Sequence, residues 1–358
     1  MTPPRLDLVI PGPLDQRTGG YIYDARMVDG LRGLGWLVKI HSVTGVFPDG
    51  DAVARDSLSA TLAGCSPNTR VIIDGLAMGA LPGPLETYQE RLRLVSLLHH
   101  PLADETGLDP ETRDRFVRLE RRALAACEGV VVTSAYTARR LDAYGVDPTR
   151  VRVVRPGTDP APLAPGVSTP VPTLLCVGAL TPRKGQDLLV TALADLDDLP
   201  WHCICVGSLE RAPRYAADVQ RLARARGLGS RIVFAGECDT DTLGRFYREA
   251  SLFVLPSHYE GYGMVLTEAL ARGLPVVSTT GGAIPDTVPA AASVLVPPGD
   301  EMALADALRG VIAGSEGADC RERLGVAARQ HARSLPDWSA ASRGFADAVR
   351  ELTPDGDV

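Results

Sequence analysis

The sequence contains no C-x-x-C pair, and its seven cysteines are an odd number. Only Cys203 and Cys205, in the apolar segment WHCICVG, stand close together. Alternate strand residues face one side, so these two thiols could share a metal, but no second ligand pair has zinc spacing. Buried, reduced thiols are the preferred interpretation, which favours an intracellular protein.

Leader-like and membrane-spanning segments are also missing. The first residues, MTPPRLDLVIPG, lack the basic and apolar regions of a signal peptide, and no run of eighteen apolar residues occurs. The 37 basic and 44 acidic residues are interspersed, with a net charge of −7. This balance argues against a nucleic acid partner, which needs a basic face, and more weakly against anionic lipid. A cytoplasmic protein without a membrane span is predicted.

What the sequence does contain is an alternation of short Val-, Ile- and Leu-rich runs with helical patterns. This alternation predicts βαβ units and parallel sheets covered on both faces. A chain of 358 residues exceeds what one core usually supports, so two Rossmann-like halves are expected. The Pro- and Gly-rich segment 153–173 is the predicted linker, and 337–352 is a one-sided terminal helix. The predicted strands lie within 6–12, 36–43, 69–77, 93–100, 129–134, 172–180, 201–207, 230–236, 251–257, 274–280 and 292–299.

Gly19 and Gly20 follow the first predicted strand. Thr18 is the expected N-cap of the next helix, so both glycines would offer backbone N–H groups to an anion at a helix N-terminus. A plain tight turn is the alternative. The fuller G-x-G-x-x-G pattern is absent, which argues against a nicotinamide or flavin site. The apolar stripe of this helix is expected at Tyr21, Ala25, Val28, Leu31 and Leu34.

Polar side chains follow two other strands at the edge where open parallel sheets bind ligands. His99 and His100 end one strand and could bind a ligand or satisfy neighbouring backbone groups. Arg183 and Lys184 stand between a strand and the following helix. Adjacent cations there suit a diphosphate, because arginine supplies a planar fork and lysine a point charge. A solvated surface pair is the alternative.

Glu260 and Glu268 stand with seven residues between them in the segment PSHYEGYGMVLTEALARG. Gly261 and Gly263 argue against one continuous helix across both glutamates. Glu260 is therefore expected on a loop, with a helix that starts near Gly263 and ends at Gly273. Even in one helix the two carboxylates would be about 12 Å apart, beyond the roughly 5–9.5 Å of a glycosidase pair. Two separate acceptors for one nucleotide sugar are the preferred hypothesis.

Together these motifs resemble the retaining GT-B glycosyltransferases of glycosyltransferase family 4. The most specific mark is EGYGMVLTEALARGLPVV, which is similar to the family's E-x7-E segment; VGALTPRKG, RIVFAG, SLFVLPS, VRVVRPGTD and the early TGG also match. The resemblance implies two Rossmann-like domains that face each other across a cleft. Residues 1–165, completed by the terminal helix 337–355, would form the acceptor-side domain, and residues 166–335 would bind the nucleotide sugar.

The resemblance also implies residue roles. Glu260 would bind donor-sugar hydroxyls, Glu268 the ribose hydroxyls, and Arg183 with Lys184 the departing diphosphate. His99 would lie near the sugar and the reaction centre. Gly19 and Gly20 would bring N–H groups to the phosphates, and residues 237–241 would lie near the base. The backbone around the sugar and diphosphate would come from Gly261, Tyr262, Gly263, Met264 and Val265.

Ala179 departs from the family pattern, because many members carry an arginine there. Arg183 is expected to take over that role. The implied reaction retains anomeric configuration and needs neither a metal nor another cofactor, and no D-x-D stands among the residues expected to bind the diphosphate. No motif identifies an oligomeric state or the acceptor; a small molecule or glycan is preferred to a lipid, bound by loops within 11–20, 74–90 and 99–116. Alternatives are a nucleotide-sugar epimerase of the same architecture and a non-catalytic nucleotide-sugar-binding protein.

Overall fold

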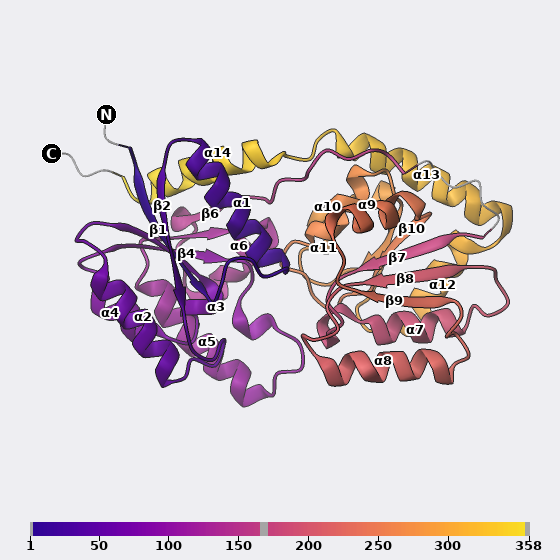
Figure 1. Ribbon diagram of the computed structural model, residues 1–358, viewed down its shortest axis with the longest axis horizontal. Helices are drawn as coiled ribbons and strands as arrows, with labels where there is room; N and C mark the ends of the chain where they lie inside the picture. The colour runs from indigo at the N-terminus through magenta and orange to yellow at the C-terminus, as the bar shows by residue number, and fades with distance from the viewer. Residues whose placement is uncertain (1–2, 165–170, 355–358) are drawn as a thin grey trace. The chain divides into compact units, whose positions relative to one another are not determined.

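The chain forms two compact units in the computed structural model, which describes residues 3–164 and 171–354 (Figure 1). Unit 1 comprises residues 1–157 and 336–358, and unit 2 comprises residues 158–335. The division after Gly157 falls eight residues before the predicted boundary at 165. Residues 165–170 of the predicted linker lie outside the described residues.

Unit 1 contains a parallel sheet with strand order β2-β1-β3-β4-β5-β6 within the described residues. Its strands are β1 Arg5–Pro11, β2 Leu37–Val43, β3 Arg70–Asp74, β4 Arg93–Leu98, β5 Gly129–Val132 and β6 Val151–Val153. Its helices are α1 Gly19–Gly33, α2 Ala52–Gly64, α3 Gly75–Met78, α4 Pro82–Tyr88, α5 Pro110–Ala125, α6 Ala135–Arg140 and α14 Trp338–Leu352. The short strand β6 was not predicted, because the predicted linker starts at Val153, the last residue of this strand.

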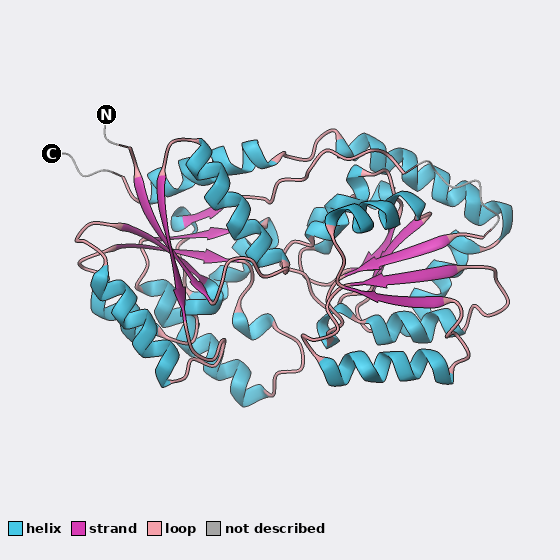
Figure 2. Cartoon of the chain, in the orientation of Figure 1, coloured by secondary structure: helices cyan, strands magenta, loops and turns pink. Residues whose placement is uncertain are grey.

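Unit 2 contains a second parallel sheet, with strand order β12-β11-β10-β7-β8-β9 in the described part of the chain. Its strands are β7 Thr173–Val177, β8 His202–Val206, β9 Ile232–Gly236, β10 Leu252–Leu255, β11 Val276–Thr279 and β12 Ser293–Val296. Its helices are α7 Gln186–Ala194, α8 Pro213–Ala225, α9 Thr240–Glu249, α10 Met264–Ala271, α11 Ile284–Thr287, α12 Glu301–Ile312 and α13 Gly314–Ala332. Helices lie on both faces of each sheet (Figure 2).

The continuous apolar runs are explained by this double coverage. Every residue of β5, β10 and β11 is buried, as expected for parallel strands packed on both faces. Each of the eleven predicted strand segments overlaps an observed strand, so the prediction of an α/β architecture with parallel sheets is confirmed. All seven cysteines lie within the described residues and are free thiols; five are buried, as predicted, whereas Cys238 and Cys320 are partly exposed. Among those residues, no helix has both the length and the apolar character needed to span a membrane.

Helix α1 starts at Gly19 as predicted, but its buried face differs from the predicted stripe. The buried residues are Tyr23, Asp24, Met27, Val28 and Leu31, whereas Leu34 is 43% exposed. In the described structure Thr18 is the N-cap residue by backbone conformation, yet its side chain makes no capping hydrogen bond. The face is set by tertiary packing: the Tyr23 hydroxyl donates to the Val154 carbonyl at 3.1 Å.

The terminal helix α14 packs on α1 within unit 1. Phe345, Val349 and Leu352 are buried, and the Tyr23 ring makes edge contacts with Phe345 and with Trp338. Arg70 of β3 donates to the carbonyl and the hydroxyl of Thr353, just after the helix. Gly30 allows the two helices to approach, because a Cβ at this position would clash with the Ser342 side chain of α14.

Gly30→Ala is therefore expected to destabilise unit 1 by about 1–3 kcal/mol, as overpacking does. Gly33→Ala is the matched control in the same helix, because a Cβ there meets no atom within 4 Å. The control should stabilise the helix by up to about 1 kcal/mol. Denaturant midpoints of the full chain measure both changes. An unchanged or raised midpoint for Gly30→Ala would contradict this account of the α1–α14 contact.

Candidate active site

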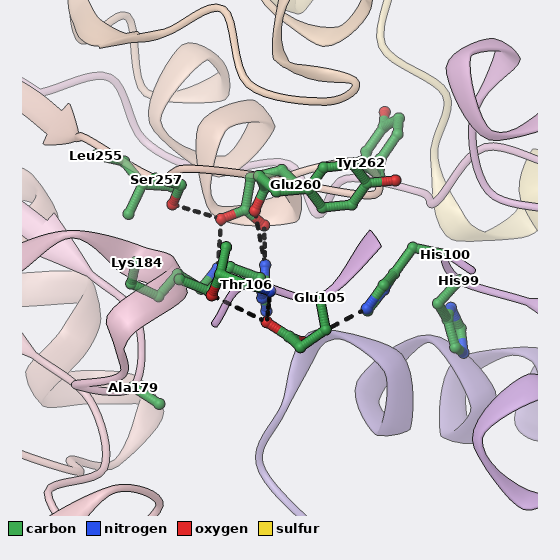
Figure 3. A network of polar contacts seen from close by, with 12 residues as sticks. His99, His100, Glu105, Thr106, Ala179, Lys184, Leu255, Ser257, Glu260 and Tyr262 are labelled. Atoms are coloured by element: carbon green, nitrogen blue, oxygen red, sulfur yellow. Dashed lines mark hydrogen bonds and ion pairs between the residues drawn. The ribbon is translucent and has the colours of Figure 1, made fainter. Parts of the chain in front are cut away.

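The loop that follows β10 carries Glu260, and its carboxylate is buried among donors (Figure 3). Lys184 Nζ donates to Oε1 at 2.7 Å, and Ser257 Oγ donates to the same oxygen at 2.6 Å. Arg183 approaches Oε2 at 3.4 Å and also donates to the Tyr259 carbonyl at 2.8 Å. The two adjacent cations and the glutamate, predicted as separate ligand-binding groups, therefore form one cluster.

The electrostatics of this cluster follow from its burial. Burial acts to raise the pKa of Glu260, but the nearby charges of Lys184 and Arg183 outweigh it and lower that pKa to about 2. Burial also lowers the pKa of Lys184 below its ordinary value, while Glu260 opposes this change. With all three groups ionised, two positive charges face one negative charge. The cluster therefore keeps a net positive charge that suits an anionic ligand.

Two glycines with positive φ hold the Glu260 loop in place. Gly185 (φ +67°) follows the 3₁₀ turn Pro182–Lys184, and a Cβ there would clash with the Pro256 carbonyl. Gly282 (φ +62°) follows β11, and a Cβ there would clash with the Glu260 carbonyl. That carbonyl accepts from the Ala283 N–H at 2.8 Å. The loop is thus enclosed by the segments that follow β7 and β11.

Helix α10 begins at Met264, directly after the loop, as predicted. Gly263 is its N-cap in the left-handed conformation (φ +89°), and Gly273 (φ +73°) follows its end. Glu268 lies on this helix, where its Oε2 accepts from the Tyr247 hydroxyl at 3.0 Å. The Arg272 guanidinium lies 4.2 Å from the centre of the Tyr247 ring and donates to the Glu268 carbonyl at 2.8 Å.

Tyr247 orients Glu268 as a neutral donor. Burial and the neighbouring carboxylate of Glu268 hold the pKa of Tyr247 well above its ordinary value. The two glutamates therefore have different surroundings: Glu260 lies in a loop between cations, and Glu268 lies on a helix beside a phenol. These surroundings do not suit the acid–base pair of a glycosidase. Such a pair needs two carboxyl groups that face the same bond of the substrate, one with a raised pKa and one with an ordinary pKa.

Unit 1 carries its own polar cluster, around His99 at the carboxyl end of β4. His99 Nε2 lies 3.1 Å from Asp24 Oδ1 and 3.4 Å from Asp74 Oδ2. The ring also packs against Gly20, where a Cβ would lie 3.1 Å from its Cδ2 atom. Tyr23 meets the ring edge-on at 5.5 Å. Gly19 and Gly20 are the first residues of α1, so the predicted placement of both at a helix N-terminus is confirmed.

The two carboxylates determine the charge of His99. Burial acts to lower the pKa of His99, but Asp24 and Asp74 raise it to about 10. Burial raises the pKa of Asp24 to about 6, although His99 acts to lower it. At neutral pH His99 is therefore an imidazolium ion held by a buried carboxylate. Neither Asp24 nor Asp74 was predicted from the sequence as a site residue.

His100, the second histidine, points to a different partner within unit 1. Its Nε2 lies 3.7 Å from Glu105 Oε2, and the Thr106 N–H donates to Glu105 Oε1 at 3.0 Å (Figure 3). Thus the paired histidines do not form one site. Figure 3 also labels Ala179, whose carbonyl accepts from the Gln186 side chain at 3.1 Å.

Two family models match this chain in succession. "Glycosyltransferase Family 4" matches residues 74–162, and "Glycosyl transferases group 1" matches residues 164–331. The chain belongs to glycosyltransferase family 4. A relative in Geodermatophilus obscurus, named D-inositol 3-phosphate glycosyltransferase, is 34% identical over 280 residues, which cover 69% of this chain and 60% of the relative. A relative of the same name in Xylanimonas cellulosilytica is 29% identical over 262 residues, which cover 68% of this chain and 61% of that relative.

Solved structures share the GT-B fold of this family 4 protein. Sucrose-phosphate synthase from Thermosynechococcus elongatus has a TM-score of 0.81 at 21% identity and covers 98% of this chain and 99% of its own. The Anabaena protein HepE, solved in complex with UDP and glucose, has a TM-score of 0.74 at 17% identity, with coverage of 96% and 99%. The predicted GT-B fold is thereby confirmed. The alignments span about 60% of the length of the two inositol-phosphate relatives.

The segment predicted to lie near the nucleotide base has a structural task in this family 4 chain. Asp239 is the N-cap of α9, where its Oδ1 accepts from the Thr242 N–H at 2.7 Å.

Among the described residues, two groups of three side chains could hold a metal ion: Asp24, Asp74 and His99, and Asp7, His41 and Cys65. In the first group a single nitrogen, Nε2 of His99, already lies within 3.4 Å of both carboxylates.

Proposed function

We propose that the chain is a retaining glycosyltransferase that moves a sugar from a nucleoside-diphosphate sugar to a hydroxyl of a small molecule or glycan. The buried cluster of Glu260, Lys184 and Arg183 is the observation that carries this proposal. It combines net positive charge with a carboxylate acceptor beside the start of α10. A diphosphate bonded to a polyhydroxylated ring has the matching chemistry.

The proposed reaction breaks the bond between the sugar's anomeric carbon and the diphosphate oxygen. The bonding electrons leave with that oxygen, and Lys184 and Arg183 stabilise its growing negative charge. Glu260 accepts a hydrogen bond from a sugar hydroxyl, and the backbone from Gly261 to Val265 surrounds the sugar and diphosphate. The acceptor oxygen attacks the same face of the ring and gives its proton to the departing phosphate. This route retains configuration and uses no enzyme nucleophile and no metal.

The remaining predicted residues complete the proposal. Glu268 accepts from the ribose hydroxyls, while Tyr247 fixes its orientation. In unit 1, His99 donates to the donor sugar, and the N–H groups of Gly19 and Gly20 bind phosphate oxygens. The acceptor is proposed to bind at the unit 1 loops within 11–20, 74–90 and 99–116. Because the relatives are named for D-inositol 3-phosphate, this compound is the first acceptor to test.

The ribose role predicts a binding defect in Glu268→Ala. One of UDP, GDP, ADP and dTDP is expected to bind the wild type at micromolar strength, and the variant should lose about 1–3 kcal/mol as a hydroxyl acceptor is removed. Titration calorimetry measures both values. Glu249→Ala, an exposed glutamate on α9, is the matched control and should bind like the wild type. Equal affinity in Glu268→Ala would contradict the ribose role.

The reaction itself is tested with the nucleotide sugars of the base that binds. Transfer to D-inositol 3-phosphate or to water should release the nucleoside diphosphate, and NMR of the product should show retained anomeric configuration. Activity should persist after treatment with a chelator. Sugar isomerisation without transfer would instead indicate an epimerase, and tight donor binding without any release would indicate a non-catalytic binding protein. Either result would refute the proposed function.

A further inference from the structure

A second cluster of ligand-type side chains lies in unit 1, on residues that the proposed transfer reaction does not use. It joins Asp7 of β1, His41 of β2 and Cys65, the C-cap residue of α2. His41 Nε2 lies 2.7 Å from Asp7 Oδ2, and Cys65 Sγ lies 3.5 Å from the same oxygen. One ligand atom from each residue lies within 4.8 Å of the others.

The fold brings these side chains together by strand register and helix packing. In the parallel pair β1–β2, Asp7 lies beside Lys39 and Val9 beside His41, so Asp7 and His41 point to the same face. Helix α2 ends over this face at Cys65. Arg91 fixes that end, because its guanidinium donates to the Cys65 carbonyl at 2.8 Å and to the Ala63 carbonyl at 3.0 Å.

The distances suit a tetrahedral ion after a small adjustment. Zinc bonds of about 2.0–2.3 Å to N, O and S place neighbouring ligand atoms roughly 3.4–3.6 Å apart. The separation of Cys65 Sγ and Asp7 Oδ2, 3.5 Å, already has this value. The 2.7 Å hydrogen bond between His41 and Asp7 would have to open by about 0.7 Å. A rotation of either side chain about its own torsions can supply this change.

Charge and access are equally suitable. One thiolate and one carboxylate would balance a divalent cation, and His41 would bind as neutral imidazole. Zinc binds the thiolate, so an incoming ion must displace the proton of the Cys65 thiol. The side chains of His41 and Asp7 are 16% and 15% exposed, so solvent can reach a fourth position.

We propose that Asp7, His41 and Cys65 bind one zinc ion, with water as the fourth ligand. The thiol selects zinc over magnesium and calcium, which prefer oxygen ligands only. The other group of three, Asp24, Asp74 and His99, lacks a thiol and holds its histidine nitrogen between two carboxylates. The zinc site is independent of the transfer reaction and joins the edge strand β2 to the end of α2.

The test uses tag-free full-length protein that a chelator has stripped of metal. Titration calorimetry with Zn²⁺ should show one strong site, and Co²⁺ should produce a thiolate-to-metal charge-transfer band in the near ultraviolet. Cys65→Ser should abolish that band, and His41→Gln and Asp7→Asn should each weaken zinc binding by at least about 100-fold, the upper end for loss of an outer-shell partner. Cys320→Ser, elsewhere in the chain, is the matched control and should keep both signals.

Absence of zinc binding in the wild type, or unchanged binding in Cys65→Ser, would overturn the proposal. Loss of the site in Asp24→Asn with retention in Cys65→Ser would overturn it too, because the ion would then belong to the His99 cluster. Circular dichroism of each metal-free variant shows whether it is folded. If His41→Gln does not fold, the zinc affinity of Asp7→Asn decides the outcome, because this substitution preserves the shape of the side chain.

Discussion

Replacement of Lys184 by methionine is expected to lower sugar transfer by about 10²–10³-fold, the loss that follows removal of one preorganised electrostatic group. Methionine preserves much of the lysine's apolar length but removes its charge. The cluster then keeps only Arg183 against the Glu260 carboxylate, so its net positive charge disappears. The rate of nucleoside-diphosphate release, measured with the donor found by calorimetry, tests this prediction.

The same change should also destabilise unit 2. Glu260 is 6% exposed and Lys184 14% exposed, so the variant leaves a buried carboxylate without its closest positive partner. Breaking a buried ion pair from one side typically costs about 3–5 kcal/mol. Burial then outweighs the remaining positive charge more easily, and the pKa of Glu260 should rise from its low value of about 2.

A double variant separates stability from catalysis. Lys184→Met with Glu260→Gln removes both charges and should recover most of the lost stability, as judged by the denaturant midpoint, but none of the transfer. Arg226→Met, an exposed cation at the end of α8, is the control and should change neither quantity. Recovery of transfer in the double variant would mean that Lys184 only neutralises Glu260 and does not assist the departing diphosphate.

This cluster shows what the sequence could and could not predict. Glycine at 263 and the apolar pattern after it located the start of α10 correctly, because both are local signals. Loop residues after two strands were also assigned correctly to one edge of a parallel sheet. The contact between Lys184 and Glu260 was not predicted. These residues are 76 positions apart, and their contact depends on the enclosure of one loop by two others.

The cluster around His99 was missed for a different reason. The stripe of α1 was chosen from apolar residues alone, and this choice excluded Asp24 from the buried face. Charged residues are rarely buried unless paired, so a buried aspartate contradicts the usual pattern. Its partner His99 is 75 positions away, and only the fold brings them together. The spacing could have predicted this burial. Asp24 lies four residues after Gly20, one helical turn along α1, so both residues share the helix face that meets the carboxyl ends of the strands.

Asp24→Asn is expected to lower transfer by about 10²-fold at pH 8 and to change its pH dependence, because Asp24 is a positioning residue for His99. In the wild type the pKa of His99 is about 10, so its charge should persist across the neutral range. Without the Asp24 carboxylate the pKa of His99 should fall, because burial is then opposed by Asp74 alone of the two carboxylates. Transfer by the variant should then decline with pH where the wild-type rate is constant.

The sign of the accompanying stability change follows from linkage. A histidine whose folded pKa is raised from 6.5 to about 10 contributes stability that is complete below pH 6.5 and is lost as the pH rises through 10. The denaturant midpoint of the wild type should therefore fall between pH 7 and 10 more steeply than that of Asp24→Asn.

NMR of the imidazole nitrogens reports the protonation of His99 directly. Asp29→Asn, an exposed aspartate on the same helix, is the matched control and should keep the wild-type profile. An unchanged pH profile in Asp24→Asn, with transfer reduced at every pH alike, would assign Asp24 to the architecture of α1 alone. A shifted profile that Asp29→Asn does not reproduce would assign the positive charge of His99 to its buried carboxylate partner, and would connect that charge to the reaction.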